Sequence, residues 1–335
     1  MTVEDGEGLL DDERRQARRE TRRRELARRR RRRTLAGLSL VLVAAAVAAV
    51  ALLAGGGSST PSSQRVALTR NPSRRSSTGA SRDAGTGTGA STGKPGTARV
   101  PILMYHVINP PPGGAPFPGL YVSANEFAAQ MQALAHAGYH AVTQDQMWAY
   151  WQHGTMPLAP GKKPIVVSFD NGYQSQYTNA LPVLRRLGWV GNENIQLTGL
   201  PPSQGGLSQA QVRGLLAAGW ELDTQGISHA DLITLDATQL AEQVATARKL
   251  IQHRYGVPVN WFCYPSGHYD ATVVAAVQAA GFTGSTTVVP GWAGPTSDPY
   301  RLPRLRVLGG TTPESLLSEL AAIRDDPAPP ASYSG

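Results

Sequence analysis

Short apolar runs alternate with amphipathic segments throughout residues 100–325, and this alternation limits the possible folds more than any other feature of the sequence. The apolar runs have the length of strands, and the amphipathic segments have the length of helices. We expect strands at 100–106, 139–142, 165–169, 195–198, 220–223, 261–264, 282–288 and 304–307. We expect helices at 124–137, 145–152, 176–186, 208–218, 237–255, 271–280 and 313–324. Such alternation favours parallel strands joined by helices, as a barrel or as an open sheet.

The first 33 residues are rich in arginine and precede a long apolar segment. They carry 13 Arg against 8 acidic residues, whereas 35–54 hold only Leu, Val, Ala, Gly and Ser. A helix of that length spans about 30 Å, the thickness of the apolar core of a bilayer. Arginine beside one end keeps that end in the cytoplasm. We therefore expect a cytoplasmic tail at 1–33, a single transmembrane helix at 34–54, and a main domain outside the cell membrane.

Two other interpretations of this N-terminal region stay open. The apolar segment could belong to a cleaved signal peptide, although the apolar core of such peptides usually has about 7–15 residues. The arginine run could also bind anionic lipid headgroups or nucleic acid in the cytoplasm. A membrane anchor explains the charge and the apolar segment together, without a further partner.

Residues 55–99 are dominated by Gly, Ser and Thr, and they lack the apolar residues that a folded core needs. We expect a flexible linker there, a folded domain at 100–325 and a disordered tail at 326–335. Residues 100–335 carry 12 basic against 15 acidic residues. No nucleic-acid partner is expected, because a nucleic-acid-binding domain has its basic residues on the folded surface. The one cysteine, Cys263, excludes an intrachain disulfide and is interpreted as a small buried residue.

Polar side chains follow three of the expected strands. They lie at 170–173, at 221–229 and at 264–270. Because the carboxyl ends of parallel strands share one edge of a sheet, these side chains should surround a common mouth. A carboxylate, imidazoles and amides in one mouth indicate general acid–base or metal-assisted hydrolysis.

These segments resemble the polysaccharide deacetylases with a NodB homology domain, also called carbohydrate esterase family 4. The family motif Thr/Ser-Phe-Asp-Asp-Gly-Tyr matches residues 168–173 at all but one position, and a motif built on two histidines aligns with 225–229. The motif Phe-x-Tyr-Pro-x-Gly matches 262–267, and 101–106 and 302–307 are similar to the opening and late family segments. The resemblance covers most of residues 100–310 and implies a distorted (β/α) barrel of the NodB deacetylase type.

The resemblance also implies roles for individual residues. Asp170 corresponds to the general base that takes a proton from water. The backbone N–H groups of Tyr173 and Ser266 correspond to those that stabilise the oxyanion. The late Leu-x-His motif, whose histidine protonates the leaving amine, is not recognisable. His106 and His268 are the nearest substitutes, and each is also compatible with a structural role.

The expected metal ligands depart from the family pattern. Asn171 stands where the family has Asp, Gln225 stands where it has the first His, and His229 is retained. Amides are weak oxygen donors and bring no charge to offset a cation. The sequence therefore predicts a weak metal site, with zinc as the typical ion, or no metal at all.

Two functions follow from these observations. The first is a membrane-anchored extracytoplasmic hydrolase that removes N-acetyl groups from cell-surface or cell-wall polysaccharide. The alternative is a degenerate NodB-like domain that binds glycan or scaffolds a wall assembly without turnover. Trp220, Trp261 and Trp292 could stack on sugar rings or pack in the core.

Overall fold

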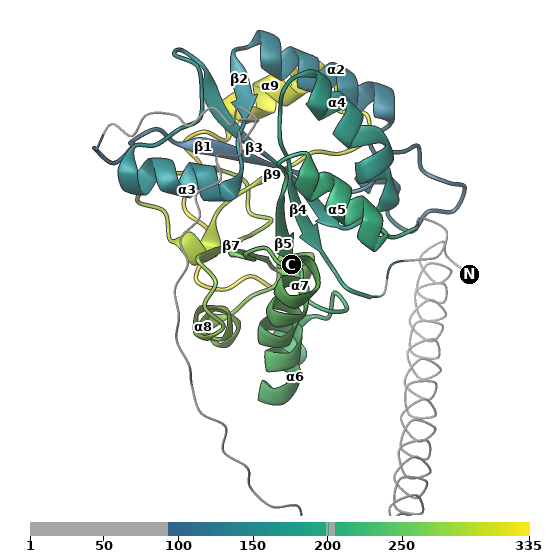
Figure 1. Cartoon of the computed structure of the whole chain (residues 1–335), viewed down its shortest axis with the longest axis vertical. Coiled ribbons are helices and arrows are strands. Elements are labelled where there is room, and N and C mark those ends of the chain that lie inside the picture. Colours follow the sequence, from purple (N-terminus) through teal and green to yellow (C-terminus); the bar gives the residue numbers. More distant parts are fainter. Residues whose placement is uncertain (1–92, 199, 201–204) are drawn as a thin grey trace, which may run out of the picture. The chain divides into compact units, whose positions relative to one another are not determined.

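A curled sheet of mainly parallel strands forms the centre of the domain (Figure 1). The computed structural model describes residues 93–198, 200 and 205–335. The strands within these residues are β1 (Val100–Tyr105), β2 (Tyr139–Ala141), β3 (Lys163–Asn171), β4 (Asn192–Ile195), β5 (Glu221–Thr224), β6 (Trp261–Cys263), β7 (Gly284–Thr286), β8 (Trp292–Ala293) and β9 (Leu305–Arg306). They follow the order β7-β6-β5-β4-β3-β1-β8, with β2 beside β3 and β9 beside β1. β8 runs antiparallel to β1, whereas the other neighbours are parallel.

Helices connect the successive strands from β1 to β7, as the sequence pattern predicts. They are α2 (Ala124–His136), α3 (Gln144–His153), α4 (Leu181–Arg186), α5 (Gln209–Ala217), α6 (Ala237–Ala241), α7 (Ala247–Tyr255), α8 (Ala271–Ala279) and α9 (Pro313–Ala322). π-helical segments at Gln176–Ala180 and Glu242–Thr246 precede α4 and join α6 to α7. Ser208 caps α5 by accepting a hydrogen bond from the backbone N–H of Gln211, which satisfies one of the free donors at the helix start.

The segment after residue 301 curls the sheet onto itself. Leu302 pairs in parallel with Thr286 at the end of β7, and Leu305 of β9 pairs with Leu103 of β1. The same short stretch of chain therefore pairs with β7 at one end of the sheet and with β1 near the other end. The prediction of an α/β fold is confirmed, in the form of a curled, mainly parallel sheet.

The two faces of β3 have different surroundings. Val167 and Phe169 are buried against α2, where the ring of Phe169 lies 5.8 Å from that of Phe127 between centroids. The alternate residues Ser168 and Asp170 point into the curl of the sheet, where both bond to a single buried arginine. The inside of the curl is therefore polar, and this polar interior leads to the functional site.

One predicted strand was misplaced for the same reason. We expected residues 195–198, but β4 spans Asn192–Ile195. Asn192 and Asn194 pair in register with Ser168 and Asp170 of β3 and share their polar side of the sheet. A strand whose inner face is polar lacks the apolar alternation that marks strands in a sequence.

The predicted disordered tail at 326–335 differs from the structure. Tyr333 exchanges two backbone hydrogen bonds with Tyr269, at 2.9 and 2.8 Å, and the Tyr269 hydroxyl donates to the Pro330 carbonyl at 2.8 Å. Pro and Ala around these positions suggested disorder, but the half-buried Tyr333 ring fastens the segment to the domain.

The expected N-terminal features lie outside the described residues. These are the tail at 1–33, the transmembrane helix at 34–54 and nearly all of the linker at 55–99. Within the part of the chain that the structure describes, no helix is both long and apolar enough to cross a bilayer.

Candidate functional site

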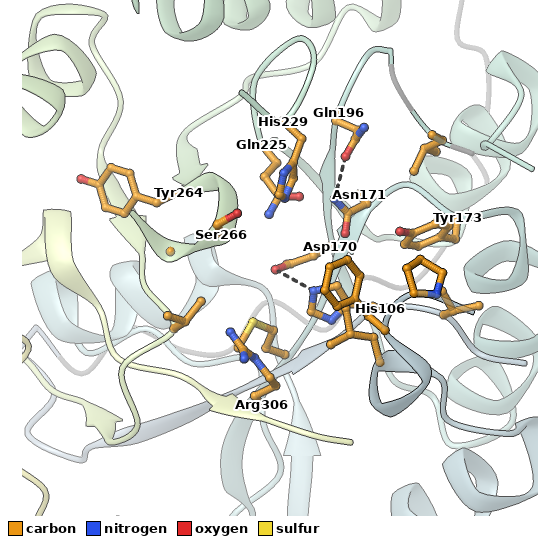
Figure 2. A pocket seen from close by; sticks show the side chains of 18 of the residues that line it. His106, Asp170, Asn171, Tyr173, Gln196, Gln225, His229, Tyr264, Ser266 and Arg306 are labelled. Carbon is orange, nitrogen blue, oxygen red and sulfur yellow. Dashed lines mark hydrogen bonds and ion pairs between the residues drawn. The ribbon is translucent and has the colours of Figure 1, made fainter. Parts of the chain in front are cut away.

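A cavity of about 590 Å³ opens where β1, β3, β5 and β6 end (Figure 2). Its volume lies in the range of about 300–1,000 Å³ that is usual for ligand sites. Its polar and aromatic lining residues are His106, Phe117, Tyr121, Asp170, Asn171, Tyr173, Gln196, Gln225, Ser228, His229, Tyr264, Ser266 and Arg306. The predicted base, all three predicted metal positions and both oxyanion positions therefore meet at one mouth.

Asp170 lies at the floor of this cavity in a buried ion pair. Its Oδ1 and Oδ2 accept hydrogen bonds from Nη1 and Nη2 of Arg304 at 2.8 and 2.9 Å. Asn194 donates to Oδ1 at 2.9 Å. Burial alone would raise the pKa of Asp170, but the Arg304 guanidinium holds that pKa well below its usual range. Asp170 is therefore ionised, and its charge is already balanced.

Asn171 follows Asp170 in a left-handed backbone conformation, with φ of 79°. Asparagine tolerates this conformation better than most residues, and Gly172, at φ 88°, continues the turn out of β3. The Asn171 amide Nδ2 donates to Gln196 Oε1 at 2.6 Å. Because the Nδ2 group is used in that bond, the side-chain carbonyl oxygen is the atom with which Asn171 could bind a cation.

Gln225 and His229 complete the predicted metal positions. Gln225 is only 2 % exposed, and its Oε1 has no hydrogen-bond partner among the described residues. His229 lies on the turn after β5, also with positive φ, and burial lowers the pKa of its imidazole. Both side chains face the cavity as neutral groups (Figure 2).

The two candidate histidines differ in position. His106 Nε2 lies 4.0 Å from Asp170 Oδ2 on the cavity wall. Burial lowers the pKa of His106 to about 4 against the opposing pull of Asp170, with Arg304 and Arg306 adding to the burial effect. A neutral imidazole can accept a proton at pH 7, but it is a poor general acid. His268 is not among the lining residues, and its Nδ1 lies 3.1 Å from Asp231 Oδ1.

The predicted oxyanion groups lie on opposite loops. Tyr173 follows β3, and Ser266 lies in the short turn Pro265–Gly267 after β6 with φ of 57°. Gly267 next to it also has positive φ, and a Cβ there would come within 2.3 Å of Val288. The turn is therefore fixed by close packing. The oxyanion role of both backbone N–H groups stays a prediction.

The donor set does not fit a tightly bound zinc ion. It consists of one imidazole and two amides, and the nearest carboxylate, Asp170, is already bonded to Arg304. Among the described residues, no group of three or more His, Cys, Asp or Glu has an arrangement that could hold a metal. Zinc is usually held by imidazole, thiolate or carboxylate, so we assign no chemical step to a metal ion at this site.

Several residues of the site were not anticipated from the sequence. Arg304 is fully buried and also donates to Ser168 Oγ and to the Thr287 carbonyl. An arginine inside an expected strand, 304–307, was the available signal for a buried charge that needs a partner. Gln196 and Phe117 had no comparable signal, since both lie in irregular segments.

The three tryptophans that could stack on sugar rings do not line the cavity and pack within the domain. Trp220 stacks on Phe169 with 4.9 Å between ring centroids, and Trp261 is fully buried. Trp292 is half-buried and donates from its indole to the Leu320 carbonyl. Cys263 is buried, as expected, and its Sγ contacts Asp170 and Arg304.

Comparisons with known proteins agree with this arrangement. The family model described as Polysaccharide deacetylase matches residues 158–285, which carry the strand with Asp170 and the turns with Gln225, His229 and Ser266. The chain carries a polysaccharide deacetylase-like domain. It is 28 % identical over 214 residues to YxkH of Bacillus subtilis (strain 168), a candidate polysaccharide deacetylase, covering 64 % of this chain and 73 % of that protein.

Solved structures show the same fold. The deacetylase PplD of Streptococcus pyogenes, in complex with acetate, superposes with a TM-score of 0.61 at 22 % identity, over 67 % of this chain and 99 % of PplD. A candidate polysaccharide deacetylase from Bacillus anthracis gives a TM-score of 0.59 at 27 % identity, over 67 % of this chain and 69 % of that one. The curled parallel sheet is therefore the half-barrel of the NodB deacetylase type. Members of this family typically depend on a metal, whereas the donors of this chain are mostly neutral amides.

Proposed function

We propose that this protein is an extracytoplasmic hydrolase that removes N-acetyl groups from cell-surface or cell-wall polysaccharide. The observation that carries the proposal is the ionised carboxylate of Asp170 at the floor of a sugar-sized cavity, in a polysaccharide deacetylase-like domain. His106 beside it supplies a neutral imidazole at 4.0 Å.

In this proposal, residues of the site orient the base, accept the proton and bind the oxyanion. Arg304 holds Asp170 in one orientation, and Asp170 accepts a proton from a water molecule whose oxygen adds to the acetyl carbonyl carbon. The backbone N–H groups of Tyr173 and Ser266 bind the carbonyl oxygen as it gains negative charge. The C–N bond then breaks, the amine nitrogen takes the proton, and acetate leaves.

A second candidate function is glycan binding without turnover. The specific observation in its favour is the pair of amides, Asn171 and Gln225, at positions where the family resemblance implies metal ligands. The unpartnered Oε1 of Gln225 can accept a hydrogen bond from the N–H or O–H of a sugar.

One set of measurements separates the two functions. The purified protein is incubated with chitooligosaccharide, peptidoglycan fragments and poly-N-acetylglucosamine, with and without added zinc, cobalt or nickel, and released acetate is measured. Release by the native protein that is abolished by Asp170→Ala supports the hydrolase. Binding of the same glycans by calorimetry without acetate release supports the binding domain, and an absence of both contradicts the two proposals.

The proposed location depends on the segment at 34–54. We propose that it anchors the protein in the cell membrane as a single span, with the N-terminus in the cytoplasm and residues 55–99 as a linker to the domain. Membrane fractions should retain the full chain after carbonate washing. A chain without residues 1–54 should appear in the soluble fraction, and recovery of both forms there would contradict the anchor.

A further inference from the structure

The rim of the cavity carries one charge that the rest of the site does not balance. Arg306 lines the cavity and is exposed, and among the ion pairs of the described residues none involves it. Figure 2 shows its side chain reaching toward the cavity from the side opposite to Gln196. Its charge also contributes to the lowered pKa of His106, so the guanidinium acts on the interior of the site.

The other formally charged residue of the cavity already has a partner. Asp170 is the other lining residue with a formal charge, and Arg304 neutralises it at 2.8 and 2.9 Å. Arg306 therefore leaves the cavity with a net positive charge.

Two exposed apolar side chains lie at the same rim. Phe117 lines the cavity and is 69 % exposed, and Leu308 is 41 % exposed. Leu308 lies beside the turn that holds Phe117, since a Cβ on Gly119 would be 3.9 Å from its Cδ2 and Gly309 donates to the Gly119 carbonyl at 3.0 Å. Leu308 also shares the outward side of the extended segment with Arg306, because Val307 between them and Leu305 before them are buried.

An exposed aromatic ring beside a ligand cavity suits the flat apolar face of a sugar ring, and a free guanidinium suits a carboxylate or phosphate. We infer that this rim is a subsite for a sugar that carries an anionic group, with Phe117 stacking on the ring and Arg306 pairing with the anion. The inference rests on the proposed function, since it names the class of polysaccharide that the cavity takes. Asp170 and the amides contact the N-acetyl sugar, and the rim selects its acidic neighbour.

The test measures binding of three tetrasaccharides of equal length to the full chain by calorimetry at low and high salt. The neutral probe is chitotetraose with all N-acetyl groups intact. The second probe is a peptidoglycan tetrasaccharide without peptides, which carries carboxylates, and the third is a phosphorylated chitotetraose. At low salt we expect one or both acidic probes to bind about tenfold more tightly than the neutral probe. The preference should shrink at about 0.5 M salt because ions screen an exposed pair.

Variants at the rim identify the groups responsible. In Arg306→Gln the ratio of acidic to neutral affinity should fall to about one, whereas Arg306→Lys should keep part of it. Phe117→Ala should weaken both acidic and neutral probes, by about five- to tenfold, because stacking does not depend on charge. Arg185→Gln is the matched control, since Arg185 is exposed at the end of α4 and does not line the cavity. It should retain the full preference.

The outcomes separate this inference from the proposed function. A preference for the carboxylated probe or for the phosphorylated probe supports the subsite and names the source of the anion. Equal affinities for all three probes, or a preference that survives Arg306→Gln, overturn the subsite. If the neutral probe is deacetylated at the same time, the proposed function stands without it. If no probe binds and no acetate appears, both fail.

Discussion

Two buried carboxyl groups lie on one row of the sheet, and their pKa values are shifted in opposite directions. Asp170 of β3, Asn194 of β4 and Asp223 of β5 are in register, and all three are almost completely buried. Asp170 is paired with Arg304, whereas Asp223 lies near two other acids, Glu221 and Asp145. Burial raises the pKa of both groups, and the Arg304 guanidinium beside Asp170 reverses this effect for Asp170 alone.

The acidic region, formed by Asp223, Glu221 and Asp145, has other hydrogen-bond partners than the Arg304 region, formed by Arg304 and Asp170. Asp223 Oδ1 accepts backbone hydrogen bonds from Trp261 at 2.9 Å and Asn260 at 3.3 Å. Burial raises the pKa of Asp223 to about 7, and burial together with Asp223 and Asp145 raises that of Glu221 well above its usual range. The Arg304 region therefore favours the ionised form of Asp170, which can act as a base, whereas the acidic region favours the protonated forms of Asp223 and Glu221.

Removing Arg304 should have the largest effect on this contrast. In Arg304→Met the Asp170 carboxylate remains buried without a cation, and we expect the free energy of unfolding to fall by about 3–5 kcal/mol. The measurement is urea denaturation at pH 7. The double variant Arg304→Met with Asp170→Asn should recover part of the loss, because no charge is then left buried. Equal losses in the single and double variants would show that the ion pair is not the cause.

The pH dependence of stability should reveal the acidic region. Because Asp223 holds its proton to about pH 7 when folded but only to about pH 4 when unfolded, the folded state binds more protons between these values. The free energy of unfolding should therefore fall as the pH rises from about 4 to 7, and Asp223 alone contributes at most about 4 kcal/mol to this fall. Asp170 has the opposite sign, since its lowered pKa removes stability only as the pH falls below about 4.

The matched variants for this pH profile are Glu221→Gln and Asp170→Asn. Glu221→Gln removes the second carboxyl group whose pKa is raised in this region, and with it the proton that this group binds on folding, so it should flatten part of the decline between pH 4 and 7. Asp170→Asn should leave that decline in place and change the profile below pH 4. A decline of full size in Glu221→Gln would mean that another group carries it.

Adding a carboxylate at the mouth of the cavity should create a metal site, unlike the ion pair of Asp170 and the protonated group of Asp223. Asn171→Asp together with Gln225→His adds a carboxylate without a cationic partner and a second imidazole beside His229. We expect zinc affinity to rise about 100-fold over the native chain, because charge and imidazole are what zinc prefers. Metal content and calorimetry measure it. Each single variant should gain less than the pair, and no gain in the pair would show that these positions do not converge on one ion.

Most of the fold but only part of the site could be predicted from the sequence. The alternation of strands and helices and the mouth around Asp170 were predicted, because local pattern and chain order encode them. β4 and the partner of Asp170 were missed, because the polar interior of a curled sheet leaves no periodic signal and Arg304 meets Asp170 across 134 residues of chain. The finding that His106 lines the cavity and His268 does not also needed the three-dimensional arrangement, since His106 ends one expected strand and His268 follows another.

The smallest predicted effect concerns Cys263, which touches both members of the ion pair. Its Sγ lies 3.2 Å from Arg304 Nη2 and 3.5 Å from Asp170 Oδ2, yet burial raises the pKa of the thiol to about 12. The thiol therefore stays protonated beside a cation, and a thiol reagent should react with it only after the protein unfolds. Cys263→Ala should lower the free energy of unfolding by about 1 kcal/mol, since it removes one buried sulfur from a packed site. Labelling of the folded protein at the rate of a free thiol would show that Cys263 is open to solvent, and this would contradict its complete burial.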